Sequence, residues 1–484
     1  MSNGLKQKTL KGIGWSFADD AANQGIRFIV GLVLARLLTP HDFGIVGIAL
    51  IFVSIFEDIS DGGFSNALIQ KKDPTPADYS TAFVVNLSFS TFLYAFLFFL
   101  APHIAVFFNN PNLVLLMRVL SIIIVIDALM FVPKARLTKN LDFKIQTKIS
   151  IIASIISGLA GITYALIGGG VWALVAQQTV RHLVNTSLLW FVNRKYFSVY
   201  FSKQSFASMF SFGSKILLSE FINSIYRHLF QIVIGKLYTP ATLGQFTKAH
   251  QFGDLFSRIF TRVIQKVSYP VLSNIQNEND RLLAAYRMLI MYAMFISFAS
   301  MLMLAAVAKP LIIILIGKKW LPSVLFLQIL CFSLMLYPLH AINLNILKVK
   351  GRSDIYLKLE VIKRIIGILP ILLGIFFNIY YMLIGCVLEG IISYYLNSSY
   401  SGRLIGYSMI QQVKDIFPSF VVALIVSGTV YLFSFLPINN FLILISQTLT
   451  GFIMFIIISE FFHIEAYCGM KSLFLNYINI HTQN

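Results

Sequence analysis

The 484-residue chain is 57% hydrophobic, contains only 12% charged residues and has a formal net charge of +18. A soluble domain of average composition carries about twice that share of charged residues, so the composition excludes an ordinary soluble protein. The basic residues occur in short segments between long apolar runs, which is typical of a multi-pass membrane protein and not of a protein that binds nucleic acid.

A helix needs about 20 mostly apolar residues to cross a bilayer, and the chain offers about fourteen such stretches. They lie near residues 12–37, 43–67, 79–101, 112–132, 149–167, 171–192, 205–235, 243–268, 283–308, 321–346, 357–377, 379–400, 416–435 and 439–461. Lysine and arginine are concentrated in alternate loops, which by the positive-inside rule places both termini in the cytoplasm. We therefore expect an all-α polytopic membrane protein with about 14 transmembrane helices.

A sequence repeat organises these helices. Residues 27–44 and 227–244 are identical at six of 18 aligned positions. Self-similarity at a fixed offset indicates structural repeats, and because each repeat holds an even number of helices, the two are parallel. We expect an N-terminal six-helix bundle in residues 1–198, a C-terminal one in 199–402 around a shared central cavity, and two additional helices with a cytoplasmic tail in 403–484.

Each repeat begins with a polar stripe on an otherwise apolar helix. An acid, an asparagine and an arginine stand at positions 20, 23 and 27, and again 200 residues later. The i, i+3, i+7 spacing places the three on one helix face. Ionisable groups within a bilayer are costly and normally face the bundle interior or water, so we expect the stripes to line the cavity.

Cations are in surplus in the seventh and eighth predicted helices, which favours an anionic cargo. The substrate-binding candidates are Asn23, Arg27, Arg181, Lys215, Asn223, Arg227, Lys248, Arg258 and Arg262. The alternative is that such charges form internal ion pairs that only hold helices together, for example Asp20 with Arg27 or Asp254 with Arg258.

Acidic residues supply candidates for gating or ion coupling. Asp58 and Arg258 occupy matching positions in the two halves and carry opposite charges, so they are a candidate ion pair that closes the cavity in one state. The alternative is that each pairs within its own half. The gating or ion-coupling candidates are Asp20, Asp58, Asp61, Glu220 and Asp254.

The sequence lacks the P-loop, HExxH and GxSxG motifs of common enzyme classes. We therefore expect that the chain is not an enzyme and that it has no catalytic residues, metal or cofactor.

The motif Thr-Pro-x-x-x-Gly occurs twice, at residues 39–44 and 239–244. Its proline and glycine predict a tight hairpin outside the membrane.

The repeat, the opening GIGWSF, the Pro-x-x-Phe-Gly ending at Gly44 and the Ala-Arg-Leu…Leu-Asp-Phe of residues 135–143 together resemble a known family. They are similar to the polysaccharide flippases of the multidrug/oligosaccharidyl-lipid/polysaccharide exporter superfamily, above all the branch for colanic and teichuronic acid units. The resemblance implies a flippase that moves undecaprenyl-diphosphate-linked oligosaccharides across the bacterial cytoplasmic membrane by alternating access. The partners implied are that lipid-linked oligosaccharide, membrane lipid, a polysaccharide polymerase and glycosyltransferases.

Three alternatives stay open at this point. A drug or cation antiporter of the same superfamily should have an acidic cavity, whereas the seventh and eighth helices here are basic. A peptidoglycan-precursor flippase shares the helix count. A membrane glycosyltransferase or polymerase acting on the same lipid carrier should have a large outer loop, and we expect no such loop here.

Overall fold

The computed structural model describes residues 3–60, 64–71, 73–193 and 200–482. The regular elements in this part of the chain are all helices, joined by short loops. The first helices are α1 (Asn3–Leu37), α2 (Pro40–Ser60), α3 (Phe64–Gln70), α4 (Pro76–Phe107), α5 (Leu113–Leu120), α6 (Ile122–Lys139), α7 (Phe143–Leu166), α8 (Val171–Val192) and α9 (Lys203–Leu237). The others are α10 (Pro240–Asn274), α11 (Asn279–Leu315), η2 (Lys318–Trp320), α12 (Pro322–Leu334), α13 (Tyr337–Val349), α14 (Ser353–Ile366), α15 (Ile368–Phe376), α16 (Ile379–Ile405), α17 (Met409–Leu432), η3 (Phe433–Phe435), α18 (Asn440–Phe461) and α19 (Glu465–Thr482).

Within the described residues, nine helical segments are long and apolar enough to cross a membrane. They correspond to nine of the predicted spans, with α5 and α6 forming one segment and α12 and α13 another. The predicted spans at 12–37, 171–192, 205–235 and 243–268 are also helices, α1, α8, α9 and α10, but these do not count among the nine. The all-α, multi-pass class is therefore confirmed, and the count of fourteen stays a prediction.

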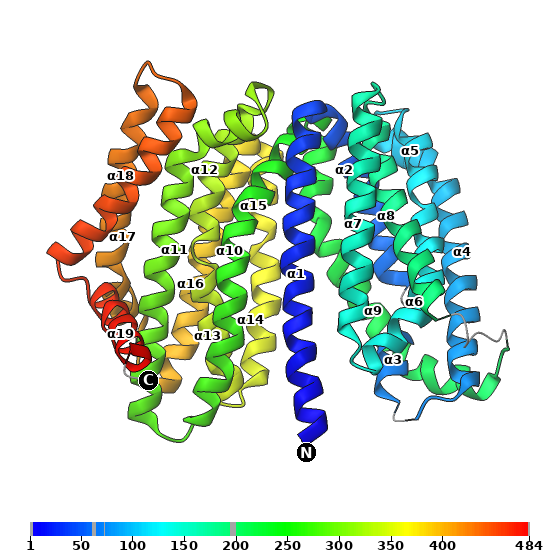
Figure 1. Ribbon diagram of the computed structural model, residues 1–484, viewed down its shortest axis with the longest axis horizontal. Coiled ribbons are helices and arrows are strands. Elements are labelled where there is room, and N and C mark those ends of the chain that lie inside the picture. Colours follow the sequence, from blue (N-terminus) through cyan, green and yellow to red (C-terminus); the bar gives the residue numbers. More distant parts are fainter. Residues whose placement is uncertain (1–2, 61–63, 72, 194–199, 483–484) are drawn as a thin grey trace. The chain divides into compact units, whose positions relative to one another are not determined.

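The chain divides into two compact units, residues 1–244 and 245–484. In unit 1 the helices run up and down beside one another: α7 packs against α1 and α8, and α4 packs against α6 (Figure 1). Helix α9 follows the predicted boundary at residue 198 but packs on α2 and α3 of unit 1. The two compact units divide after residue 244, whereas the predicted sequence repeats divide after residue 198. The repeats stay a prediction.

Helix α4 shows why such a helix suits a bilayer. Thr75 caps its first turn, accepting a hydrogen bond from the Asp78 amide, and proline occupies the first helical position. The polar side chains of Asn86 and Ser90 are buried inside the unit. Large apolar side chains are exposed at helical spacing on the other side: Phe92, Phe96, Phe99 and Val106. This inside-out distribution is the one expected where hydrocarbon surrounds a helix.

The two Thr-Pro-x-x-x-Gly motifs pack directly on each other in unit 1. A Cβ atom on Gly44 would lie 1.7 Å from the carbonyl oxygen of Pro240, and one on Gly244 would lie 2.0 Å from the carbonyl oxygen of Pro40. The hairpin prediction places the chain reversal correctly, before each proline. The interpretation of the glycines as turn residues is wrong, because both lie inside helices, where they permit a reciprocal close approach of backbones.

Unit 2 is built around α11, which packs against α12, α17 and α18. The predicted span at 357–377 consists of two helices, α14 and α15, separated at Gly367. The predicted tail contains the helix α19, which lies against α11 (Figure 1). Arg287 of α11 contacts both Asp415 of α17, at 2.6 Å, and Glu465 of α19, at 3.2 Å. Charged contacts therefore fix the end of the chain to the body of unit 2.

Candidate functional site

An arginine and an aspartate meet where α9 packs on α2. Arg227 Nη2 lies 2.9 Å from Asp58 Oδ2, and the Ser224 hydroxyl donates a hydrogen bond of 2.5 Å to the same oxygen. Glu220, on the preceding turns of α9, lies 3.9 Å from Arg227. The Arg227 side chain keeps 56% of its surface exposed, so its guanidinium retains hydrogen-bonding capacity toward the outside of the unit. We call these four residues the Arg227 site.

The sequence predicts a gate between Asp58 and Arg258. The described partners of Asp58 are Arg227 and Ser224. Arg258 is part of α10, but its side chain lies outside the described ones, as do those of Asp20 and Lys215. Asp61 is itself outside the described residues. The Asp58–Arg258 gate therefore stays a prediction.

Asn23, the middle residue of the polar stripe on α1, faces α7. The Asn23 amide donates hydrogen bonds to Asp19, at 2.6 Å, and to Ser150, at 2.9 Å, and its oxygen accepts one from Ser154, at 2.7 Å. Asn23 is 7% exposed. Because Asp19 and Asn23 are four residues apart, as are Ser150 and Ser154, each pair shares one helix face. Asn23 thus joins α1 to α7 here, and its contact with substrate stays a prediction.

The other candidates differ in accessibility. Arg27 and Arg262 are exposed, whereas Asn223 and Arg181 are half-buried. Lys248 is buried and donates a hydrogen bond of 3.1 Å to Gln251. Asp254 lies 3.2 Å from His250, one turn before it on α10. The substrate-binding and gating roles of these residues remain predictions.

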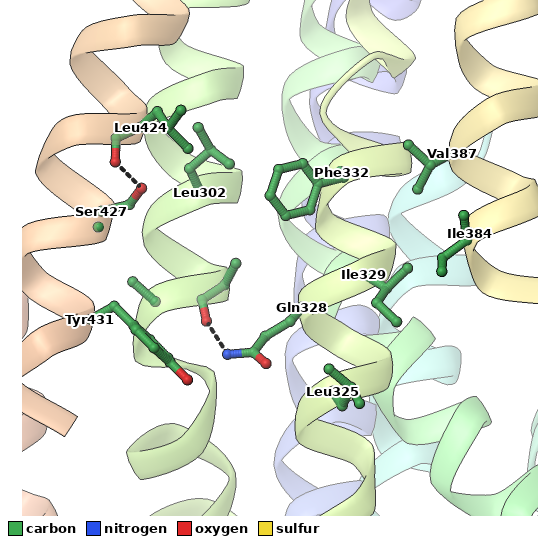
Figure 2. A pocket seen from close by; sticks show the side chains of 13 residues that line it. Leu302, Leu325, Gln328, Ile329, Phe332, Ile384, Val387, Leu424, Ser427 and Tyr431 are labelled. Carbon is green, nitrogen blue, oxygen red and sulfur yellow. Dashed lines mark hydrogen bonds between the residues drawn. The ribbon is translucent and has the colours of Figure 1, made fainter. Parts of the chain in front are cut away.

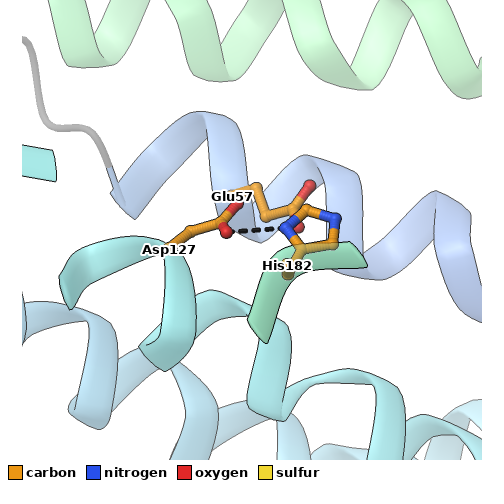
Figure 3. Close-up of side chains that lie close together, drawn as sticks. All are labelled: Glu57, Asp127 and His182. Carbon is orange, nitrogen blue, oxygen red and sulfur yellow. Dashed lines mark hydrogen bonds and ion pairs between the residues drawn. The ribbon is translucent and has the colours of Figure 1, made fainter. Parts of the chain in front are cut away.

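A cluster absent from the predicted site residues lies within unit 1. Glu57 of α2, Asp127 of α6 and His182 of α8 point toward one another (Figure 3). His182 Nδ1 is 2.6 Å from Asp127 Oδ1, and one side-chain nitrogen or oxygen of each residue lies within 4.8 Å of the others. Each of the three lies in a mostly apolar stretch of the sequence. Only the packing of α2 on α6 and α8 brings the three together.

Unit 2 contains an apolar cavity of about 540 Å³ between α11, α12, α16 and α17 (Figure 2). Leu302, Ile329, Phe332 and Leu424 are among the side chains that line it. The polar side chain of Gln328 donates a hydrogen bond of 3.1 Å to the Ala305 carbonyl. The cavity is therefore suited to a hydrocarbon group. No sequence signal could have found it, because its lining is indistinguishable from ordinary apolar helix surface.

Comparison with known proteins identifies a family and several relatives of this chain. A family model described as polysaccharide biosynthesis protein matches residues 33–325, more than half of the 484 residues. The chain is 26% identical to the lipopolysaccharide biosynthesis protein WzxC of Escherichia coli (strain K12) over 376 residues, which cover 76% of either chain. It is 26% identical to the teichuronic acid biosynthesis protein TuaB of Bacillus subtilis (strain 168) over 72% of this chain and 73% of the relative. It is 25% identical to the succinoglycan biosynthesis transport protein ExoT of Rhizobium meliloti (strain 1021), over 66% and 65% of the two chains.

Two solved structures share the fold. The lipid II flippase MurJ, in an inward closed conformation, matches with a TM-score of 0.72 at 16% identity and covers 94% of this chain and 99% of its own. An inward-facing multidrug resistance transporter of the MATE family matches with a TM-score of 0.60, also at 16% identity, over 79% of this chain and 95% of its own. At this identity the likeness shows the fold and no more.

Proposed function

Because the chain belongs to the polysaccharide biosynthesis protein family, we propose that it is a flippase that translocates undecaprenyl-diphosphate-linked oligosaccharide repeat units. The transport crosses the bacterial cytoplasmic membrane by alternating access and supplies surface polysaccharide or lipopolysaccharide synthesis. A diphosphate bearing sugars is too polar to cross hydrocarbon unaided, so such a cargo requires a protein path.

Two of the sequence predictions are confirmed by the family. The resemblance to polysaccharide exporters holds, and the chain is a multi-pass transporter and not an enzyme. A membrane glycosyltransferase or polymerase is thereby excluded.

The Arg227 site is the observation that carries the cargo proposal. Arg227 lies in a long, mostly apolar helix, yet more than half of its side chain is exposed. An arginine in this setting is costly unless it faces water or an anion, and its planar guanidinium suits bidentate contact with phosphate. An arriving diphosphate would replace Asp58 as the partner of Arg227.

The cavity in unit 2 supports the lipid part of the same cargo. Its lining is almost entirely apolar and it opens between helices. An isoprenoid chain is the one portion of the proposed substrate that gains by leaving water for such a surface.

The finer architecture is part of the proposal. It comprises fourteen spans, two parallel six-helix repeats around a central cavity, and both termini in the cytoplasm. The family match, the 200-residue offset and the alternation of basic loops support it.

Two transport alternatives remain, a drug or cation antiporter and a peptidoglycan-precursor flippase. The surplus of cations in the seventh and eighth predicted spans argues against a cationic cargo. The names of the sequence relatives, which concern lipopolysaccharide, teichuronic acid and succinoglycan, favour polysaccharide units over peptidoglycan precursors.

The test is surface polysaccharide in a host whose own copy of this gene is replaced by variants. Arg227→Ala should reduce surface polysaccharide about tenfold or more, because a charge-assisted hydrogen bond contributes about 1.5–3 kcal/mol. Arg227→Lys should retain part of the export. Arg281→Ala is the matched control, since Arg281 is exposed and pairs with Glu278 at the start of α11.

Protein in the membrane fraction must be equal in every strain. If Arg227→Ala exports as much polysaccharide as the unaltered chain, Arg227 does not hold the cargo. If the strain lacking the chain still exports, the proposed function is wrong.

A further inference from the structure

The cluster of Glu57, Asp127 and His182, which we call the His–carboxylate cluster, contains more negative than positive charge. With both carboxylates ionised and the imidazole fully protonated, its formal charge is still −1. Glu57 and Asp127 lie in segments apolar enough to cross a membrane. An uncompensated charge in such a place is energetically costly. The cluster therefore needs another cation.

Among the described side chains, no lysine or arginine forms an ion pair with the cluster. On α2, Asp58 is already paired with Arg227 of α9, so that pair adds no net charge. On α8, Arg181 directly precedes His182, so the two side chains project about 100° apart around the helix axis. The other charged or titratable groups on α2, α6 and α8 and on the helices that pack against them, α3, α4, α5, α7 and α9, are His41, Asp42, Asp78, Tyr79, Tyr94, His103, Arg118, Lys134, Arg136, Lys139, Lys144, Lys148, Tyr164, Lys203, Lys215, Glu220, Tyr226, His228 and Lys236.

The distances favour a proton over a metal ion. Nitrogen and oxygen ligands bind first-row metals at about 2.0–2.2 Å, so two such ligands at ordinary coordination angles stand about 2.8 Å or more apart. His182 Nδ1 and Asp127 Oδ1 are 2.6 Å apart, which is the spacing of a charge-assisted hydrogen bond. One proton therefore lies between His182 and Asp127, and Glu57 is the remaining acceptor beside them (Figure 3).

We propose that the His–carboxylate cluster is a site of reversible proton binding, with Glu57 taking up the exchangeable proton. The added proton neutralises the cluster, which lets α2, α6 and α8 pack without water between these side chains. Loss of the proton restores the negative charge and favours an arrangement in which water reaches Glu57. A ligand that binds two arrangements unequally shifts the equilibrium between them. If the chain is the flippase proposed above, this proton is its coupling ion.

The test is infrared difference spectroscopy between acid and alkaline buffer, on the full purified chain in phosphatidylcholine bilayers. The unaltered chain should show the carbonyl stretch of a protonated carboxylic acid in an apolar setting, disappearing as the pH rises. Glu57→Gln should abolish this band, and Glu57→Asp should keep it at a changed frequency. Glu278→Gln is the control, because Glu278 is an exposed carboxylate paired with Arg281 and should leave the band unchanged.

A band unchanged in Glu57→Gln would overturn the proposal, and so would a cluster that responds to Na⁺ at constant pH and not to protons. Glu57→Asp covers the case in which Glu57→Gln fails to fold. The measurement uses no cargo, so its outcome is independent of the export assay. A chain that shows the band but exports no polysaccharide would refute the proposed function alone.

Discussion

Asp58 is held between two side chains of α9, Arg227 and Ser224. Reversing one charge, as in Asp58→Arg or Arg227→Asp, places like charges beside each other and should lower the melting temperature of the purified protein. The pair is partly exposed, so the interaction lost is about 0.2–1 kcal/mol, with like-charge repulsion added to it. The double reversal should recover part of the loss, measured by thermal unfolding in detergent.

Recovery should be incomplete, because the new aspartate at position 227 would lie near Glu220. A double variant whose loss equals the sum of the two single losses would show that the residues do not interact. The matched control is Arg352 with Asp354, an exposed pair outside the nine candidate spans, whose reversal should leave the melting temperature nearly unchanged.

At this scale the sequence could identify Arg227 and Asp58 as costly charges but not as neighbours. The 200-residue offset matches Asp58 with Arg258 because it aligns equivalent positions, and equivalence is not contact. The observed pair arises because α9 packs on α2, which no local pattern in either helix encodes. The same reason applies to the cluster of Glu57, Asp127 and His182. The sequence shows the three residue types, but not that they lie close together in the fold.

At the scale of helices, the start of α2 and the start of α10 form a reciprocal contact through Gly44 and Gly244. Gly44→Ala would place a methyl group against the Pro240 carbonyl, where backbone must move to make room. Overpacking of this kind costs about 1–3 kcal/mol or more, so the melting temperature should fall. Gly47→Ala is the control, because its Cβ would meet nothing closer than Leu243 at 3.9 Å.

Gly244→Ala should be as harmful as Gly44→Ala, since the two contacts mirror each other. Melting temperatures equal to that of Gly47→Ala for both would show that the close approach is absent. The repeat itself could be found from the sequence. The reason for its glycines could not, because a glycine that permits backbone contact looks the same in sequence as one that forms a turn.

At the scale of the whole molecule, composition and hydropathy were sufficient for the class. Low charge together with apolar runs of about 20 residues predicts membrane-spanning helices, because a helix satisfies its backbone groups internally where hydrocarbon offers them no partner. Counting helices was harder. Helices α1, α9 and α10 carry polar residues along their length, which lowers their hydropathy, although each is 35 residues long.

The proposed function is the movement of a lipid-linked oligosaccharide from the inner to the outer leaflet. The most direct measurement compares the two leaflets in spheroplasts whose polysaccharide polymerase has been removed, using a membrane-impermeant glycosidase to count outer-leaflet repeat units. With the chain present, most undecaprenyl-diphosphate-linked oligosaccharide should be open to the glycosidase, and without it the lipid should accumulate protected in the inner leaflet. An equal accessible fraction in both strains would show that the chain does not translocate this lipid.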